Sequence, residues 1–323
     1  MKKQQPLFII LGIVVIFLGY EFLFRQYPNA TSKNKKQQDS TNTTAESFSA
    51  KKDSSKNKNK EGNGGIFDFD GAEKDSILTT EDSIAQTYAT TVFRNQQLKF
   101  SRVRDAYKAK KEIVNQYYKD KNIDEETLQI YMRVFKKEKE LEIWAKDKSK
   151  EKFILLKKYT ICAISGKLGP KRKAGDDQTP EGFYHIDRFN PKSTFLLSLG
   201  FNYPNKADKF AADSINVGKD IFIHGDCKTT GSLPMTDEKI QEIYVIAVDA
   251  KASGQKKLPI NIFPTKLNNE NFNFLKEEYA DKPALIKFWK QLKEGYQAFE
   301  KCKILPDVII DSKGNYKIKS NCK

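Results

Sequence analysis

The chain has 323 residues, enough for one large domain or two smaller ones, and a formal net charge of +15 at pH 7. Such a charge can indicate nucleic-acid binding. However, the lysines are spread along the whole chain, often beside Glu or Asp, and no motif that reads RNA or DNA accompanies them. We therefore expect no nucleic-acid partner. With two histidines and no C-x-x-C pair among four cysteines, the sequence also predicts no metal site and no cofactor.

A hydrophobic run from Leu7 to Tyr20 follows a short basic N-terminus. The run is slightly shorter than the roughly 17–25 residues that span a bilayer, unless Phe22 to Phe24 extend it. Bulky and charged residues follow it instead of small ones, which favours a retained signal anchor and transmembrane helix over residues 1–25 rather than a cleaved signal peptide. The lysines ahead of the run favour an exported body, although Arg25 and nearby lysines weaken this bias.

Residues 26–80 are predicted to form a disordered linker, because Lys, Ser, Thr, Asn and Gln dominate the stretch up to residue 65. Residues 81–150 are predicted to be a helical segment, with one helix over 83–118 and a second over 125–144. The second helix is predicted from apolar residues that recur at the helical period, namely Leu128, Tyr131, Val134, Phe135, Leu141 and Trp144.

The pattern changes after residue 150, where short β-branched and apolar runs are separated by Gly, Pro and Asn. These runs predict strands over 153–165, 181–187, 195–201, 220–224 and 259–263. Helices are predicted over 236–250, with Thr236 as N-cap, and over 270–279 and 282–301, before a hairpin around 311–314. The expected fold class is α+β. Its small, mostly β core covers 151–268, and a C-terminal helical extension with a terminal hairpin covers 269–323.

The four cysteines are Cys162, Cys227, Cys302 and Cys322. An oxidising compartment, which an exported body would occupy, permits disulfides between them. Cys302 and Cys322 are the obvious candidates, but the sequence leaves the pairing open.

Imidazole chemistry in this chain can fall only on His185 or His224. His185 lies inside a predicted strand, where a structural or surface role is the default interpretation. His224 ends an apolar strand and is followed by Gly225, a typical place for a catalytic base. Eight residues later, Ser232 follows Gly231 just before a helix, where backbone N–H groups could hold an oxyanion.

Six segments carry a resemblance to a known family. They are Gly166–Lys171, Thr179–Tyr184, Asn190–Ser193, Tyr203–Asn205, Ile221–Gly225 and Gly231–Asp237. In this order they resemble the L,D-transpeptidase catalytic domain of the YkuD type, and specifically its YafK-like branch. The resemblance covers about residues 131–263, and its most specific parts are the T-P-x-G-x-[FY] strand and the I-H-G to M-T-D segment.

The resemblance implies a cysteine-based reaction on peptidoglycan stem peptides, so that these peptides are the expected partner. In this reaction a thiolate attacks the carbonyl of diaminopimelate, and the acyl group then passes to an amine or to water. The resemblance further implies a location in the inner (cytoplasmic) membrane, with a single span and the catalytic body facing the periplasm.

Carried onto this chain, the family pattern makes His224 the base and gives the oxyanion to the N–H groups of Gly231 and Ser232. Substrate contacts are expected from Lys167, Lys171, Tyr184, Gly225 and Thr230. The charged loop that holds the two lysines suits recognition of carboxylates and amines, although an ordinary solvated loop explains it equally well. Thr230 stands where the wider family has a second histidine, which fits the YafK-like branch.

Ser232 departs from the family, because it stands where the pattern has the nucleophilic cysteine. A hydroxyl depends on a strong and well-oriented base, so this exchange should cost orders of magnitude in rate. Three interpretations stay open: an engineered inactive form, a natural pseudoenzyme or scaffold that still binds stem peptides, and a true serine enzyme. A basic, membrane-tethered adaptor outside this family is a further alternative. Cys227 is expected to be structural or redox-labile rather than a substitute nucleophile.

Overall fold

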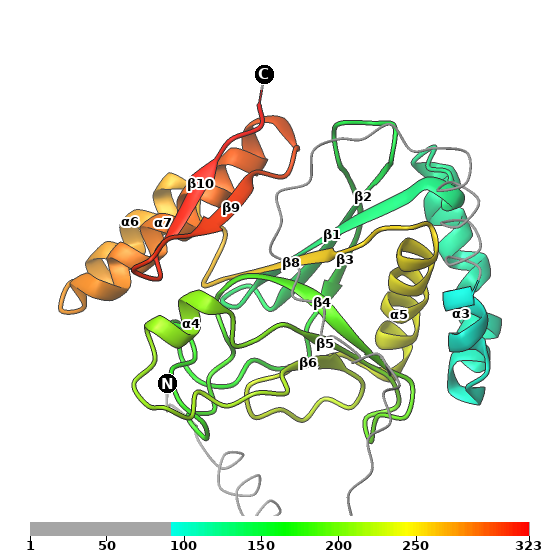
Figure 1. The fold of residues 1–323 in the computed structure, drawn as a ribbon, viewed down its shortest axis with the longest axis horizontal. Coiled ribbons are helices and arrows are strands. Elements are labelled where there is room, and N and C mark those ends of the chain that lie inside the picture. The colour runs from blue at the N-terminus through cyan, green and yellow to red at the C-terminus, as the bar shows by residue number, and fades with distance from the viewer. Residues whose placement is uncertain (1–91, 323) are drawn as a thin grey trace, which may run out of the picture. The chain divides into compact units, whose positions relative to one another are not determined.

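The computed structural model describes residues 92–322, which belong to one compact unit spanning Glu73–Lys323 (Figure 1). An eight-stranded sheet with the order β3-β2-β1-β8-β4-β5-β6-β7 forms its centre. The strands are β1 (Leu128–Phe135), β2 (Glu140–Asp147), β3 (Ile154–Thr160), β4 (Gly182–Asn190), β5 (Ser198–Phe201), β6 (Phe222–His224), β7 (Leu233–Pro234) and β8 (Leu258–Phe263). The pairs β1–β8 and β6–β7 are parallel, and the others are antiparallel.

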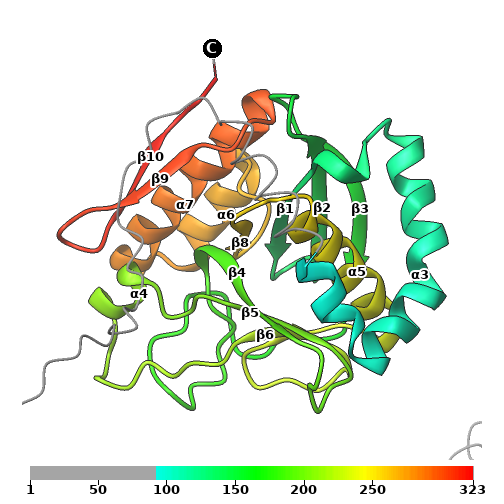
Figure 2. The same cartoon turned by 45° about the vertical axis from the view of Figure 1, so that its right-hand side comes forward.

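Helices cover both faces of this sheet (Figures 1 and 2). Helix α5 (Asp237–Ala252) lies against one face, and α3 (Ser101–Asp120) packs outside it. A C-terminal extension lies on the other side and consists of α6 (Asn269–Glu278), α7 (Pro283–Cys302) and the hairpin β9 (Asp307–Ile310) and β10 (Tyr316–Lys319). The short elements η1 (Glu125–Thr127) and α4 (Lys206–Phe210) complete the fold. The mixed sheet with its helices confirms the predicted α+β class.

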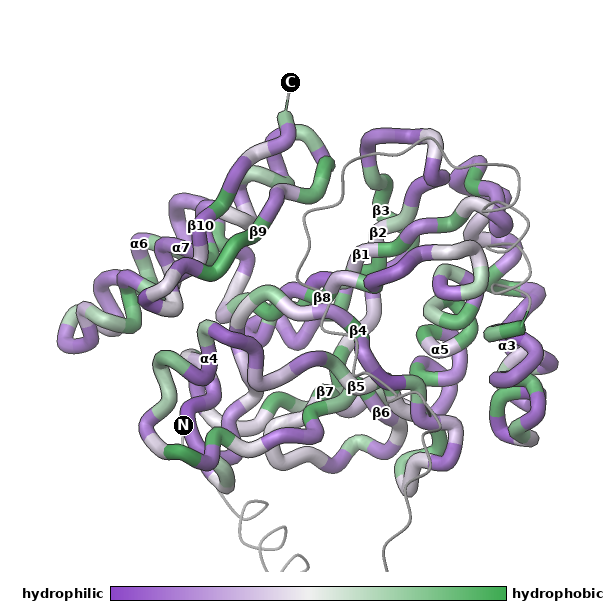
Figure 3. The backbone as a smooth tube through the Cα atoms, viewed as in Figure 1, coloured by the Kyte–Doolittle hydropathy of each residue, from purple (hydrophilic) through white to green (hydrophobic). Residues whose placement is uncertain are grey.

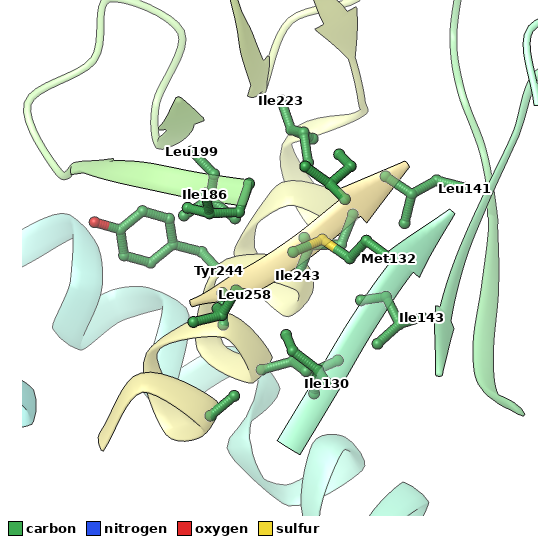
Figure 4. Close-up of a cluster of buried hydrophobic side chains, with 14 of the residues drawn as sticks. Ile130, Met132, Leu141, Ile143, Ile186, Leu199, Ile223, Ile243, Tyr244 and Leu258 are labelled. Atoms are coloured by element: carbon green, nitrogen blue, oxygen red, sulfur yellow. The ribbon is translucent and has the colours of Figure 1, made fainter. Parts of the chain in front are cut away.

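The main core lies between the sheet and α5 (Figure 4). Side chains from all eight strands and from α5 meet there, including Ile130, Met132, Leu141, Ile143, Ile186, Leu199, Ile223, Ile243, Tyr244 and Leu258. Figure 3 shows α5 as largely hydrophobic and α3 as mostly hydrophilic, as expected for an inner and an outer helix. Each fully buried aliphatic side chain contributes about 1.5–3 kcal/mol relative to exposure, so this core fixes the strands that carry the site.

The helix predicted over 125–144 is wrong, because this segment forms η1 and most of the β1–β2 hairpin. Both faces of β1 are buried: Ile130 and Met132 belong to the main core, while Tyr131 and Phe135 pack beneath α7. A strand buried on both faces loses the alternation of polar and apolar residues. Its apolar positions therefore matched a helical period. As a result, β1 and β2 were predicted to precede the β core, whereas they belong to its sheet.

The other predicted elements after residue 150 are present with small shifts in their ends. Thr236 is the N-cap of α5, since its side chain accepts the N–H of Lys239 at 3.4 Å. The helix predicted over 83–118 is interrupted at residues 99–100, and α3 then runs to Asp120. The anchor predicted over 1–25 and the linker over 26–80 lie outside the described residues. Between residues 92 and 322, no helix is both long enough and apolar enough to cross a bilayer.

All four cysteines are paired, and the structure resolves the pairing that the sequence left open. Cys302 bonds to Cys322, which links the end of α7 to the segment after β10. Cys162 bonds to Cys227, which links the segment after β3 to the segment after β6. The expected Cys302–Cys322 bond is therefore confirmed, and the second bond lies beside the predicted site.

Two buried cations, one in β1 and one directly after it, hold the extension against the sheet. The guanidinium of Arg133 donates to Glu142 at 2.7 Å and to Glu300 of α7 at 2.5 Å, and it lies over the Trp144 and Phe299 rings. The ammonium of Lys136 is 3.0 Å from Glu181. Glu181 in turn accepts the indole N–H of Trp289 in α7 at 2.7 Å.

Candidate active site

Strand β6 fixes the backbone of His224 from both sides. Ser198 of β5 pairs with His224 on one side, and Pro234 of β7 pairs with it on the other. The carbonyl of His224 accepts the N–H of Met235 at 2.7 Å. The preceding residue, Ile223, is fully buried in the main core. His224 is consequently held at the end of a short but firmly packed strand, as predicted.

The imidazole of His224 is oriented and only 3% exposed. Its Nδ1 lies 2.5 Å from the carbonyl oxygen of Gly225. In a neutral ring this contact holds the proton on Nδ1 and leaves Nε2 as the basic nitrogen. Burial lowers the pKa of His224, against the opposing effects of the Gly225 carbonyl and of Asp226. The lowered pKa favours the neutral ring, which is the form that a general base needs.

The ring of Phe195 covers the imidazole, with ring centroids 4.6 Å apart and planes inclined by 31°. The carbonyl of Phe195 also accepts the N–H of Gly225 at 3.0 Å. Sequence reasoning missed this residue, because only the pairing of β5 with β6 brings the segment before β5 next to His224. Phe195 thus shapes the surroundings of the predicted base.

Ser232 lies just ahead of β7, the strand that pairs with β6. Its hydroxyl accepts the backbone N–H of Phe222 at 3.2 Å, and its carbonyl accepts the hydroxyl of Thr229 at 2.7 Å. Ser232 is thereby placed opposite Phe222, two residues before His224 in β6. Within residues 92–322, no hydrogen bond joins the Ser232 hydroxyl to the imidazole. Because β6 and β7 are parallel, Ser232 lies beside the start of β6, whereas His224 is at its end. The described residues contain no proton-transfer contact between them of the kind that a serine nucleophile needs.

Gly231 forms the turn that precedes Ser232. Its φ of +117° lies in the region that favours glycine, and a Cβ at this position would be 2.9 Å from the carbonyl oxygen of Gln178. In the part of the chain described by the structure, the N–H groups of Gly231 and Ser232 donate to no acceptor. They are available to an oxyanion, and the oxyanion role stays a prediction.

Two of the predicted substrate-binding side chains are engaged inside the protein. Lys171 is 4% exposed, and its ammonium pairs with Asp176 at 2.5 Å. Tyr184 is also buried, and its hydroxyl is 3.1 Å from a carboxylate oxygen of Asp208. Both residues stabilise the folded chain, because each polar group is consumed by an internal partner. A direct substrate contact is therefore not available to either of them in this structure.

Gly225 also has an internal reason to be glycine. A Cβ there would be 2.5 Å from a carboxylate oxygen of Asp237 and 2.8 Å from the carbonyl of Phe195. The backbone that approaches this glycine is thus the protein's own, whereas a substrate backbone was predicted. Thr230 and Lys167 are exposed, so their predicted substrate contacts stay predictions.

The Cys162–Cys227 disulfide lies in the loop between His224 and Ser232. The N–H of Cys162 donates to the carbonyl of Pro234 at 3.0 Å, so the segment after β3 is joined both to this loop and to β7. A paired sulfur is not a nucleophile, which agrees with the structural or redox-labile role expected of Cys227. Cys162 was not singled out in the sequence, because its partner is 65 residues away.

A neutral histidine at a strand end, two unused N–H groups and a hydroxyl residue before a helix are the parts of a site for acyl transfer. The L,D-transpeptidase catalytic domain model matches residues 129–262 of the chain. Over 183 residues the chain is 34% identical to "Putative L,D-transpeptidase YafK" of Escherichia coli strain K12, covering 56% of this chain and 70% of that protein. The YafK protein of E. coli O157:H7 gives the same values. The chain belongs to the L,D-transpeptidase catalytic domain family.

Similarity to solved structures is more distant. The helical cell shape determining protein Pgp2 from Campylobacter jejuni is 17% identical, with 60% of this chain and 91% of that chain covered and a TM-score of 0.35. Bd1075 from Bdellovibrio bacteriovorus is 19% identical, with 57% and 77% covered and a TM-score of 0.32. At these scores, neither likeness carries weight for the function of this chain.

Proposed function

We propose that this protein binds peptidoglycan stem peptides along the paired strands β6 and β7, and that acyl transfer at Ser232 is slow or absent. Family membership supports the stem peptide as ligand. The observation that carries the second part is the hydrogen bond of the Ser232 hydroxyl, which accepts from the Phe222 N–H while the imidazole of His224 bonds elsewhere.

The hydrogen bond of the Ser232 hydroxyl matters because a hydroxyl and a thiol differ in how they become nucleophiles. A thiol is ionised to a few per cent at neutral pH and is intrinsically nucleophilic, whereas a hydroxyl must lose its proton to a base during attack. The base therefore has to contact the hydroxyl. In this site His224 is oriented as a base would be, but between residues 92 and 322 no hydrogen bond joins the Ser232 hydroxyl to its imidazole.

Intact-protein mass spectrometry with a diaminopimelate-containing tetrapeptide tests the proposal, alongside a binding titration. We expect the wild-type protein to bind the peptide without a covalent adduct. Ser232→Cys should gain an acyl adduct, and Ser232→Cys combined with His224→Gln should lose it. The thiols of Ser232→Cys are counted first, because the new sulfur could exchange with the Cys162–Cys227 bond.

Three results would contradict this proposal. An adduct on wild-type Ser232 would make the protein a serine enzyme, and one on Cys227 would move the nucleophile. The absence of any binding to the tetrapeptide or to sacculi would remove the peptidoglycan role and favour an adaptor.

A second function, serine-based acyl transfer or hydrolysis, is favoured by one specific observation. The Nδ1 contact of His224 and the unused N–H groups of Gly231 and Ser232 retain two parts of the acyl-transfer machinery. This function predicts slow turnover of the tetrapeptide that Ser232→Ala abolishes. Turnover that survives in Ser232→Ala would exclude it.

The proposed ligand implies an envelope location. Residues 1–25 would form a single-pass anchor in the inner membrane, and the catalytic body would lie in the periplasm. The two disulfides support it, because such bonds persist in oxidising compartments. Alkaline phosphatase fused after residue 323 should be active in cells, and membrane fractions should hold the protein. Inactive phosphatase fusions in stable protein would contradict this location.

A further inference from the structure

A cavity of about 640 Å³ lies between the loop over residues 167–178, α4 and the C-terminal extension. Figures 1 and 2 both show α4 next to the extension. The hairpin turn reaches the catalytic body here, since a Cβ added at Gly314 would overlap the side chain of Phe210. Neither His224 nor Ser232 lines this cavity, so it is a separate feature of the molecule.

The lining of the cavity is strongly and unevenly charged. Six cationic side chains line it, namely Lys167, Arg172, Lys173, Lys282, Lys287 and Lys313. No ion pair joins any of these six to another residue between 92 and 322. The lining also contains Asp176 and Asp213, but Asp176 is already neutralised by Lys171 at 2.5 Å and accepts three backbone N–H groups. The cavity therefore carries a surplus of positive charge.

The beginning of α7 adds to this positive potential. The helix starts at Pro283, and its next two residues line the cavity. The first turn contains no acidic residue, and Lys282 provides no side-chain cap. The N–H groups of Leu285 and Ile286 donate to the carbonyl of Lys282. The positive end of the helix dipole is therefore not compensated by an acidic side chain and adds to the positive potential at the cavity.

Buried contacts fix the walls in place. Beneath the loop, the ammonium of Lys136 donates to the carbonyls of Lys167 at 3.0 Å and Gly169 at 2.7 Å. The same ammonium pairs with Glu181, which holds α7 through Trp289. The loop and α7 are thus tied to one buried ion pair, and the cavity is preformed in the way that ligand sites usually are.

One wall of the cavity adjoins the predicted active site. Gln178 lines the cavity, and its side-chain oxygen accepts the N–H of Lys167 at 3.0 Å. Its backbone carbonyl packs against Gly231, the residue before Ser232. A peptide chain that leaves the Ser232 turn along Gln178 would therefore meet the cationic wall.

We infer that this cavity binds the carboxylate groups of a short acidic peptide, outside the residues of the acyl-transfer site. The inference rests on the proposed function, because a stem peptide is such a peptide. The lysine and arginine side chains form charge-assisted hydrogen bonds with carboxylates, and Leu168, Leu285 and Phe288 offer apolar contact to aliphatic parts. The cavity thereby extends the ligand-binding surface into the C-terminal extension.

Calorimetric titration of the full chain with the tetrapeptide L-alanyl-γ-D-glutamyl-diaminopimelyl-D-alanine tests this inference. Lys287→Gln with Lys313→Gln removes two exposed charges from α7 and the hairpin turn, so the fold should be unaffected. We expect at least a tenfold weaker affinity for this variant. The matched control, Lys108→Gln with Lys119→Gln on the exposed side of α3, should change affinity less than twofold. The same peptide with amidated carboxylates should bind both variants and the wild type alike.

Amide chemical shifts locate the ligand. The inference predicts shifts at Gly169 and Gly314 in addition to those at Gly231. If the wild type binds the peptide and the Lys287→Gln/Lys313→Gln variant binds it with the same affinity, the inference is overturned and the proposed function stays intact. No binding to the wild type would overturn both. Vesicles that contain phosphatidylglycerol test the alternative source of anions: binding of vesicles, but not of the peptide, through these lysines would also overturn the inference.

Discussion

The phenyl ring of Phe195 lies against the imidazole of His224, with the ring centroids 4.6 Å apart. Phe195 itself is 39% exposed, so it separates a buried histidine from solvent with a side chain that is partly at the surface. Desolvation is the largest cause that lowers the pKa of His224. Phe195 is therefore a positioning residue whose removal has a defined electrostatic consequence.

Replacing Phe195 by Ala should raise the pKa of His224 toward its ordinary value, because water then reaches the imidazole. Two-dimensional NMR titration of the histidine ring measures this change. Phe274→Ala is the matched control, since Phe274 is a similarly exposed phenylalanine on α6. An unchanged titration curve in Phe195→Ala would show that the phenyl ring does not desolvate the histidine.

Removal of the Cys162–Cys227 bond by Cys162→Ser with Cys227→Ser should lower the free energy of unfolding by about 2–4 kcal/mol, because the unfolded chain regains the freedom of a long loop. It should also broaden the amide signals of residues 225–232. Urea unfolding and NMR measure the two effects. Cys302→Ser with Cys322→Ser is the control and should leave those signals sharp. Identical spectra for both double variants would contradict a local bracing role at the site.

Replacing Lys136 by Met should cost about 3–5 kcal/mol of stability, because the carboxylate of Glu181 is then buried without its cation. The exposed neighbour Lys137 provides the control, and Lys137→Met should change stability little. Combining Lys136→Met with Glu181→Gln should recover much of the loss. Denaturant titrations of the four proteins measure these differences, and equal losses in the two single variants would refute the buried-pair argument.

Asp208 should give the protein a pH-dependent stability. Burial raises the pKa of Asp208 to about 6, so the folded protein holds this proton more tightly than the unfolded chain does. Its stabilising contribution is complete below about pH 4 and is lost as the pH rises through about 6, a change of about 3 kcal/mol. Asp208→Asn removes this titration. The difference in unfolding free energy between the two proteins, measured from pH 4 to 7.5, should follow this curve, and parallel profiles would contradict it.

The sequence predicted well those elements that are bounded by turn residues or by helix caps. Thr236 ahead of an acidic first turn indicated α5, and Gly314 in a polar turn indicated the β9–β10 hairpin. The β1–β2 hairpin was misread, because both of its faces are buried and the usual alternation is missing. Burial on the second face comes from α7, which lies more than 130 residues further along the chain and cannot be inferred from the local pattern.

The sequence likewise predicted some features of the candidate site and missed others. The sequence placed His224 at a strand end and Ser232 shortly before a helix, and the structure agrees. It did not reveal that Lys171 is consumed by Asp176, because the ion pair depends on how the loop folds back. Phe195 and Cys162 were missed for the same reason, since their contacts with the site arise only from strand pairing and from a bond between distant segments.

The aromatic packing under α7 determines which fragments of this protein can be handled in isolation. A fragment that ends at residue 268 would bring to water two apolar clusters, one with Phe135 and Phe263 and one with Tyr131 and Trp144. Surfaces of this kind drive self-association. The same fragment would also lose the Glu300 partner of Arg133. Residues 269–322 thus cover these aromatic side chains of the sheet, and a fragment that stays monomeric has to retain them.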